Sequence, residues 1–225
     1  MGRLGWCLAV AACAALARPG VAAGQELADL DYENLSFRGF GFDWGYMWPT
    51  TVERTGSFGL RFDLGYAGPG LRIMPNIIYW SAPLDAEKVA RLEERLATLV
   101  SGQTGGAPPV IDLGRIERTD IALGVDGHIV WSIPFNILTY GGLGVAGHIL
   151  NGDGAAINDT LLEDLLDEVT AGLNLHVGAE YLVTDRFRLY TQARYEVIPD
   201  IQYFQVRFGW QIMTGENAPG EVVGR

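Results

Sequence analysis

Hydrophobic and polar residues alternate along most of the chain between residues 36 and 212. In the first such segment, an aromatic side chain occupies every second position from Phe40 to Trp48, and the positions between Phe40 and Tyr46 hold glycine or Asp43. Alternation with a period of two residues is typical of β-strands with one apolar and one polar face. The same pattern predicts eight strands, over residues 36–48, 57–66, 71–79, 118–131, 135–149, 173–183, 187–197 and 203–212.

The connections between these strands alternate between short and long. Short turns are expected at residues 67–70, 132–134 and 184–186, and longer loops at residues 49–56, 83–115, 150–172 and 198–202. In an antiparallel arrangement all short turns share one end with both termini, and all long loops share the other end. An even-stranded barrel with short periplasmic turns and longer external loops has this layout, and strands of roughly 9–11 residues suffice to cross a bilayer.

Two of the long loops contain leucines at helical spacing. Apolar residues predict one helix over residues 85–100, with Asp85 as its N-cap. A second helix is predicted over residues 158–171, where Thr160 and Glu163 form a capping-box pair. Both helices are expected to lie outside the cell, at the external mouth of the barrel.

The first 23 residues are typical of a signal peptide. Arg3 precedes an apolar stretch that is too short to span a bilayer, and small residues end at Ala23. Residues 10–13 also resemble a bacterial lipoprotein box, so lipidation of Cys13 is the alternative to cleavage after Ala23. The expected organisation is a signal peptide (1–23), a periplasmic lead-in (24–33), an outer-membrane barrel (34–212) and a polar C-terminal tail (213–225).

Composition separates a membrane barrel from a soluble barrel of the lipocalin type, which also has eight alternating strands. The formal net charge is −11 and Lys88 is the single lysine. A soluble barrel would carry lysines on its wet face, whereas this polar face is rich in glycine, arginine and carboxylates. That set suits a cramped interior, because the planar guanidinium pairs well with carboxylates. The absence of a basic cluster in the sequence also argues against a nucleic-acid partner.

We therefore expect the polar face to line the lumen and the apolar face to contact lipid, with aromatic belts near both strand ends. The expected polar network of the lumen consists of Asp43, Arg61, Asp63, Arg72, Arg118, Asp120, Asp126, His176, Glu180, Arg188, Gln192, Arg194, Glu196 and Arg207. The expected aromatic belts consist of Trp48, Tyr66, Tyr79, Trp131, Phe135, Tyr181, Phe187, Tyr195, Phe204 and Trp210.

This order of strands, turns and loops resembles the small eight-stranded outer-membrane barrels of Gram-negative bacteria, such as the transmembrane domain of OmpA, OmpX and OmpW. The resemblance covers residues 34–212 and lies in pattern and topology. It implies an all-β fold: an eight-stranded antiparallel up-and-down transmembrane β-barrel in the bacterial outer membrane, with short helices in two extracellular loops. Proteins of this kind commonly end on an aromatic residue, whereas here residues 213–225 follow the last strand.

Candidate catalytic and metal-binding residues are sparse. His128, His148 and His176 are scattered over three predicted strands without a metal-ligand spacing, so neither a metal site nor a cofactor is expected. Acyl transfer needs a nucleophile beside a histidine, and no histidine is followed two residues later by serine, as a deacylase pattern requires. His148, near Asp153, is the single histidine that the sequence places near outer-leaflet lipid.

These observations favour a non-enzymatic role. Eight strands enclose an interior that side chains about fill, so Arg/Asp/Glu pairs would plug the lumen. We expect a structural or surface-interaction protein that contacts outer-membrane lipids and meets an extracellular partner through loops 83–115 and 150–172. A lipid-modifying enzyme of the acyltransferase or deacylase type and a small gated channel remain the alternatives.

Overall fold

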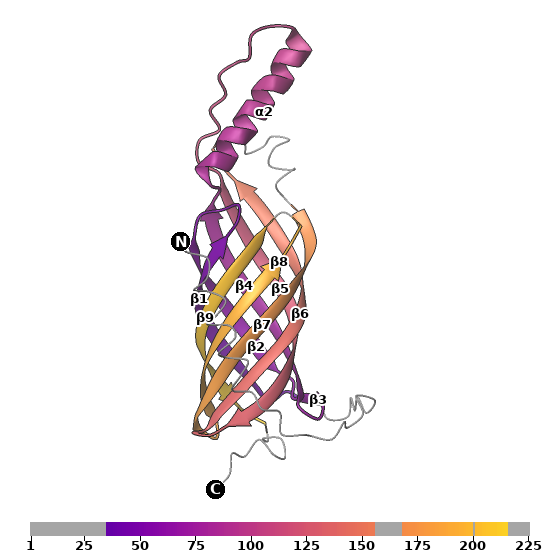
Figure 1. The fold of residues 1–225 in the computed structure, drawn as a ribbon, viewed down its shortest axis with the longest axis vertical. Coiled ribbons are helices and arrows are strands. Elements are labelled where there is room, and N and C mark those ends of the chain that lie inside the picture. The colour runs from indigo at the N-terminus through magenta and orange to yellow at the C-terminus, as the bar shows by residue number, and fades with distance from the viewer. Residues whose placement is uncertain (1–34, 156–167, 200, 216–225) are drawn as a thin grey trace, which may run out of the picture. The chain divides into compact units, whose positions relative to one another are not determined.

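The computed structural model describes residues 35–155, 168–199 and 201–215, which all fall within one unit of the chain, residues 31–225 (Figure 1). The predicted signal peptide and lead-in lie outside the described residues. The eight long strands are β1 (Gly39–Pro49), β2 (Thr55–Asp63), β4 (Leu71–Pro83), β5 (Glu117–Ile133), β6 (Ile137–Asp153), β7 (Glu168–Thr184), β8 (Phe187–Val197) and β9 (Gln202–Met213). The described residues also contain a short strand, β3 (Tyr66–Gly68), and one helix, α2 (Ala86–Thr104).

The strands form a closed antiparallel barrel. Their order is β2-β1-β9-β8-β7-β6-β5-β4-β3, and a further pairing of β2 with β4 closes the sheet. The predicted strand 57–66 is interrupted: β2 ends at Asp63 and β3 resumes at Tyr66, because Gly65 has a φ of +78° and its N–H donates to the Asp63 carboxylate. With β2 and β3 on one edge of β4, the barrel has eight strands around its wall, as predicted.

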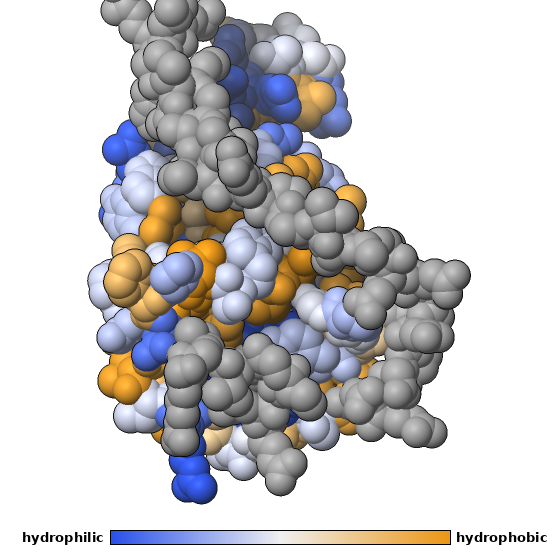
Figure 2. Space-filling view, turned by 60° about the horizontal axis from the view of Figure 1, so that its bottom comes forward, coloured by the Kyte–Doolittle hydropathy of each residue, from blue (hydrophilic) through white to orange (hydrophobic). Residues whose placement is uncertain are grey.

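Strand alternation places the apolar face outside and the polar face inside. Trp44, Phe58 and Leu123 are 57%, 55% and 53% exposed, whereas Asp43 and Asp120 are buried inside the barrel. Hydrophobic side chains lie on the outer surface seen in Figure 2. This arrangement is the reverse of a soluble barrel, which encloses its apolar face.

The two ends of the barrel differ as predicted, but several boundaries move. Short turns at residues 69–70, 134–136 and 185–186 share one end, called the short-turn end, and α2 rises from the opposite, long-loop end (Figure 1). The predicted turn 132–134 is wrong by two residues. Phe135 and Asn136 have left-handed φ values of +72° and +58°, within a three-residue connection between the paired Ile133 and Ile137.

The helix predicted over residues 85–100 is confirmed as α2, with Asp85 at its N-cap position. The helix runs past Gly102 and ends at Gly105, whose φ of +68° suits a helix terminus and whose N–H donates to the Ser101 carbonyl. The return segment packs against it, since the Leu113 N–H donates to Glu93 at 2.9 Å. Apolar contact between the two involves Leu84, Val89, Leu92, Leu96, Ile111, Leu113 and Ile116.

The second predicted helix, residues 158–171, is wrong at its C-terminal end. Residues 168–171 belong to β7, which starts five residues earlier than the predicted strand 173–183, and they pair with β6 from Gly147 to Leu150. Thr160 and Glu163 lie outside the described residues. Within the part of the chain that the structure describes, no helix has the length and apolar character needed to cross a membrane.

Candidate functional site: the barrel lumen

Polar side chains fill the lumen because every second residue of each strand points inward. Every residue of the expected network is buried, with an exposed fraction of 7% or less. Most of these residues gather in three groups, described below from the short-turn end to the long-loop end, whereas Arg118 lies 3.9 Å from Glu168.

Glu180 on β7 is the centre of the group at the short-turn end. Its carboxylate accepts hydrogen bonds from Arg61 at 2.7 Å, from Arg72 and, at 3.4 Å, from Arg188. Asp63 accepts a hydrogen bond from Gln211 and lies 3.7 Å from the Arg72 guanidinium. Strands distant in sequence are thereby joined through one fully buried carboxylate.

Asp43 on β1 is the centre of the second group. Arg207 on β9 donates to both of its oxygens, at 2.6 and 2.7 Å, and the Tyr190 hydroxyl donates to it at 2.5 Å. The Arg61 guanidinium stacks 3.2 Å above the Tyr190 ring. This contact connects the second group to the Glu180 group.

The third group lies toward the long-loop end and contains three carboxylates. Arg194 donates to Asp126 at 2.9 Å and to Glu196 at 2.6 Å. His148 lies between two of the carboxylates: its Nδ1 is 2.8 Å from Asp120 and its Nε2 is 3.5 Å from Glu196. The imidazolium form of His148 would donate to Asp120 and lie within ion-pair distance of Glu196.

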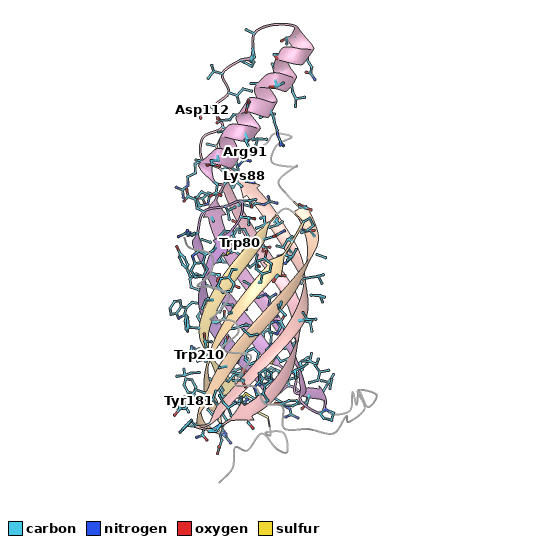
Figure 3. The ribbon with its side chains drawn as sticks, viewed as in Figure 1. Trp80, Lys88, Arg91, Asp112, Tyr181 and Trp210 are labelled. Atoms are coloured by element: carbon cyan, nitrogen blue, oxygen red, sulfur yellow. The ribbon has the colours of Figure 1, made fainter. Side chains whose placement is uncertain are left out.

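An apolar layer, which was not predicted from the sequence, also lies in the lumen at the long-loop end. Trp80 and Met47 are fully buried there, and Trp80 lies high in the barrel beneath α2 (Figure 3). Residues of two loops, Val52 and Ile198 among them, close over the layer. The full cluster comprises Met47, Val52, Ile78, Trp80, Ala82, Ala122, Ala146, Leu150, Ile198, Ile201 and Tyr203.

Two histidines and an aspartate meet between the second and third groups. Candidate ligand atoms of Asp126, His128 and His176 lie within 4.8 Å of one another, and all three side chains are buried. No such grouping was predicted from the sequence. Asp126 and His128 lie on β5, and His176 lies on β7. They meet because β6, which separates β5 from β7, carries Gly142 and Gly144 at this level.

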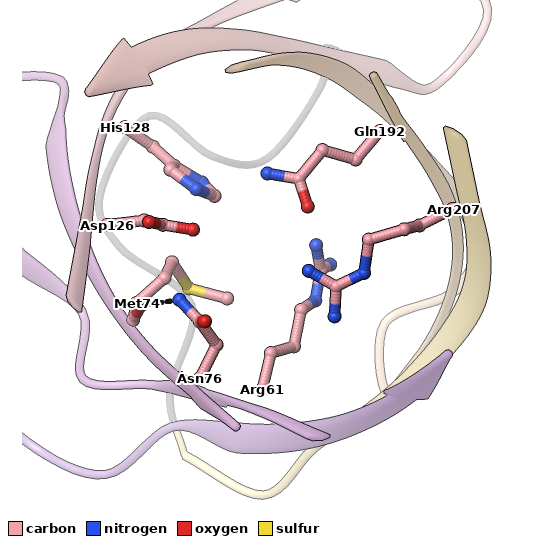
Figure 4. A pocket seen from close by; sticks show the side chains of 7 residues that line it. All are labelled: Arg61, Met74, Asn76, Asp126, His128, Gln192 and Arg207. Atoms are coloured by element: carbon pink, nitrogen blue, oxygen red, sulfur yellow. Dashed lines mark hydrogen bonds between the residues drawn. The ribbon is translucent and has the colours of Figure 1, made fainter. Parts of the chain in front are cut away.

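A small cavity adjoins this cluster. Its volume is about 10 Å³, roughly the space of one water molecule. Figure 4 shows Asp126 and His128 on one side of the cavity and Arg207 on the other. The lining residues are Arg61, Met74, Asn76, Asp126, His128, Gln192 and Arg207.

The expected belt aromatics all face outward to some degree. Tyr181 and Trp210 lie toward the short-turn end (Figure 3). Tyr66 and Phe187 are partly buried, the Tyr66 ring beneath the Arg38 guanidinium at 5.5 Å. The other expected belt residues are between 37% and 85% exposed, namely Trp48, Tyr79, Trp131, Phe135, Tyr181, Tyr195, Phe204 and Trp210.

Several lumen residues were missed because aromatic and amide side chains do not stand out as chemistry in a sequence. Their position on the inward face was the available signal: Tyr190 falls between Arg188 and Gln192 at the same strand parity. The residues missed are Ser57, Tyr140, His148, Tyr190 and Tyr203. Five more lie on the predicted polar faces but were not included in the expected network: Asn76, His128, Asn174, Gln205 and Gln211.

No protein-family model and no curated protein matched the sequence. Among solved structures, the chain is similar to Neisserial surface protein A (NspA), at 12% identity and a TM-score of 0.51, over 79% of this chain and 97% of that one. It is also similar to Ail, the attachment invasion locus protein of Yersinia pestis (9% identity, TM-score 0.48, 80% and 99% of the chains). A third is a major outer membrane protein from Thermus thermophilus (13% identity, TM-score 0.44, 79% and 99%). The resemblance to small outer-membrane barrels is confirmed at the level of the fold.

Proposed function

We propose that this protein is an integral barrel of the bacterial outer membrane with a closed, ion-paired lumen, and that it serves a structural or surface-interaction role. The observation that carries the proposal is the reversal of the two barrel faces. Side chains such as Leu143, 68% exposed, cover the outside, while six arginines and six carboxylates of the described residues are buried inside. Apolar patches of this extent on a soluble protein would drive association, whereas a bilayer accommodates them.

Two kinds of packing support a lumen that does not conduct. The Glu180 and Asp43 groups fill the barrel with guanidinium and phenol side chains between the short-turn end and its middle. The apolar layer around Trp80 lies beyond them at the other end. An ion that entered would have to disrupt buried ion pairs and then cross an apolar layer, and both steps are costly.

The position of His148 weighs against the lipid-modifying alternative. The sequence placed this histidine near outer-leaflet lipid, but its ring is fully buried and bonded to Asp120 inside the lumen. If refolded protein hydrolyses or acylates lipid and His148→Ala abolishes that turnover, the enzyme alternative replaces the proposal.

The surface role is assigned to the segment 84–116, which contains α2. Lys88, Arg91 and Arg95 follow one face of the helix and, with Leu92, line a shallow concavity on it. Figure 3 labels Lys88 and Arg91 on the first turns of α2, the end of the helix nearer the barrel. A partner with phosphate, sulfate or carboxylate groups would fit this face. The triple variant Lys88→Ala/Arg91→Ala/Arg95→Ala should lose binding to anionic vesicles, whereas Glu94→Gln on the adjacent face should not.

Two measurements test the central proposal together. Membranes containing the protein are washed with alkaline carbonate, and the purified protein is reconstituted into planar bilayers. We expect the protein to stay with the membrane and to give no conductance steps above background. Release into the wash would contradict the membrane assignment, and stable single-channel steps would favour the gated channel.

A further inference from the structure

The cluster of Asp126, His128 and His176 combines the side-chain types that bind transition metals, and it lies where bulk water does not reach. Asp126 and His128 are inward neighbours on β5, and His176 comes from β7 across one intervening strand. Their exposed fractions are 3%, 1% and 1%. Buried imidazoles and carboxylates are normally hydrogen-bonded. A buried ring nitrogen without a hydrogen-bond partner is therefore a candidate ligand for an ion.

The two histidines present unused ring nitrogens. Neither nitrogen of His128 has a hydrogen-bond partner among the described residues, and the same holds for Nε2 of His176. His128 stacks on Tyr140 with ring centroids 4.3 Å apart and nearly parallel planes, so its ring orientation is fixed. Its nitrogens therefore remain available at a defined position.

Asn174 supports the other two members of the cluster. Its amide oxygen lies 2.7 Å from Nδ1 of His176, so Nδ1 carries the proton and Nε2 keeps its lone pair. The Asn174 amide nitrogen donates to Asp126 at 3.1 Å. A polar partner that fixes the tautomer of a histidine and orients a carboxylate is the usual outer support of a metal site.

The wall of the barrel is cleared around the cluster. A Cβ atom on Gly142 would lie 2.8 Å from Nε2 of His176, and one on Gly144 would overlap both Asp126 and Asn174. A side chain at position 144 would displace Asp126 and Asn174, whereas one at position 142 would first meet the backbone carbonyl oxygen of Gly127. The adjoining cavity of about 10 Å³ has room for one water.

Each arginine near the cavity is bound by a carboxylate, and Arg61 shares Glu180 with Arg72 and Arg188. Arg207 is bound by both oxygens of Asp43, and Arg61 is bound to Glu180. Arg194 shares its guanidinium between Asp126 and Glu196. Each of these three cations therefore has a carboxylate partner.

We propose that Asp126, His128 and His176 bind one divalent transition-metal ion of the Zn²⁺ class, with a water molecule in the cavity as the fourth ligand. Two imidazoles and one carboxylate suit Zn²⁺, Co²⁺ or Ni²⁺, whereas Ca²⁺ and Mg²⁺ require sets of oxygen ligands. Ligand atoms around tetrahedral zinc lie about 3.3 Å apart, so the side chains must approach from their present spread of up to 4.8 Å. Because His128 is held by its stacking on Tyr140, the approach requires torsions of the Asp126 and His176 side chains toward it.

The packed lumen determines how the site would be loaded. The apolar layer covers the long-loop end and the Glu180 group fills the other, so the ion would enter while the barrel folds. The test therefore refolds the full chain from denaturant into detergent with one molar equivalent of Zn²⁺. Excess metal is then removed by dialysis against a weak chelator, and retained zinc is measured by elemental analysis.

We expect wild-type protein to retain one zinc per chain, and folded His128→Gln and His176→Gln to retain less than a tenth of that amount. His148→Gln is the matched control, because it removes the third buried histidine and should retain zinc. Asn174→Ala should weaken binding about 10–100-fold by releasing the tautomer of His176. Folding of each variant is checked by circular dichroism before the metal is measured.

A measurement on the wild type alone covers the case in which variants fail to fold. Protein refolded with Co²⁺ should show the intense visible absorption of a four-coordinate cobalt site. Weak bands of hexaaquo-like cobalt, or no zinc retained by the wild type, would overturn the proposal. Equal retention by the wild type and folded His128→Gln, or equal loss in His148→Gln, would overturn it as well.

Discussion

Arg207 and Asp43 form a bidentate ion pair where the last strand of the barrel, β9, pairs with the first, β1. The guanidinium on β9 donates to both carboxylate oxygens on β1, and both side chains are almost fully buried. Gly59 on β2 leaves the space that the guanidinium occupies, since a Cβ there would overlap it. The pair thus closes the barrel with side chains at the place where backbone pairing joins its two ends.

Replacing Arg207 tests the strength of this closure. Arg207→Leu should lower the free energy of unfolding by about 3–5 kcal/mol, because Asp43 would remain buried with the Tyr190 hydroxyl but without its cation. Urea unfolding in detergent, followed by tryptophan fluorescence, measures the change. Arg207→Leu/Asp43→Leu should recover part of the loss, and a double variant no better than the single one would speak against a buried-charge penalty.

Arg194→Leu should destabilise the barrel by a similar amount, about 3–5 kcal/mol. It removes the cation shared by Asp126 and Glu196, both of which stay in the lumen. Arg54→Leu, an exposed arginine, is the control and should change stability by less than about 0.5 kcal/mol. Unchanged stability together with a gain of ion conductance would instead favour a gated pore.

Alanine substitution should lower the stability of the barrel at one glycine of β6 and leave it nearly unchanged at another. Gly144→Ala should cost about 1–3 kcal/mol, because its methyl group would overlap Asp126 and Asn174. Gly147→Ala should be nearly neutral, because its Cβ points outward with no atom of the described residues within 4 Å. Comparing the two unfolding midpoints checks the assignment of inside and outside. Equal effects would mean that the lumen relaxes freely around β6.

Trp80→Ala should lower stability by about 3–5 kcal/mol, since the ring is fully buried in the apolar layer and packs edge-on to Tyr203. Trp44→Ala, on the outer face, should cost less because Trp44 is 57% exposed. Bilayer recordings of Trp80→Ala should still show no conductance, because the Glu180 and Asp43 groups remain in place. Channel steps in this variant would locate the permeability barrier in the apolar layer alone.

The wall of the barrel could be predicted from sequence because alternation is a local property. Each strand face is visible in a few residues, and short turns set the order of antiparallel neighbours. Errors arose where local signals conflict. Residues 168–171 continue a helical pattern of leucines, yet pairing with β6 makes them strand.

The contacts inside the lumen could not be predicted in the same way. The alternation along each strand correctly placed the charged residues on one face. Which of them form ion pairs depends on the strand register and on the height of each residue along the barrel axis. Asp43 and Arg207 are 164 residues apart, and Asp126 meets His176 only because glycines leave the strand between them bare. The apolar layer was missed because Trp80 lies beyond the predicted end of its strand.

The glycines of β6 leave one stretch of the barrel wall without inward side chains, and side chains of the neighbouring strands occupy the space inside it. Side chains of β5 and β7 lean over this strand and fill space that β6 leaves vacant. Truncating a few of those side chains would leave a cavity beside the β6 backbone without a change of the backbone itself. Substitutions of the side chains that face β6 are therefore the ones expected to open space in the lumen without a change of the backbone.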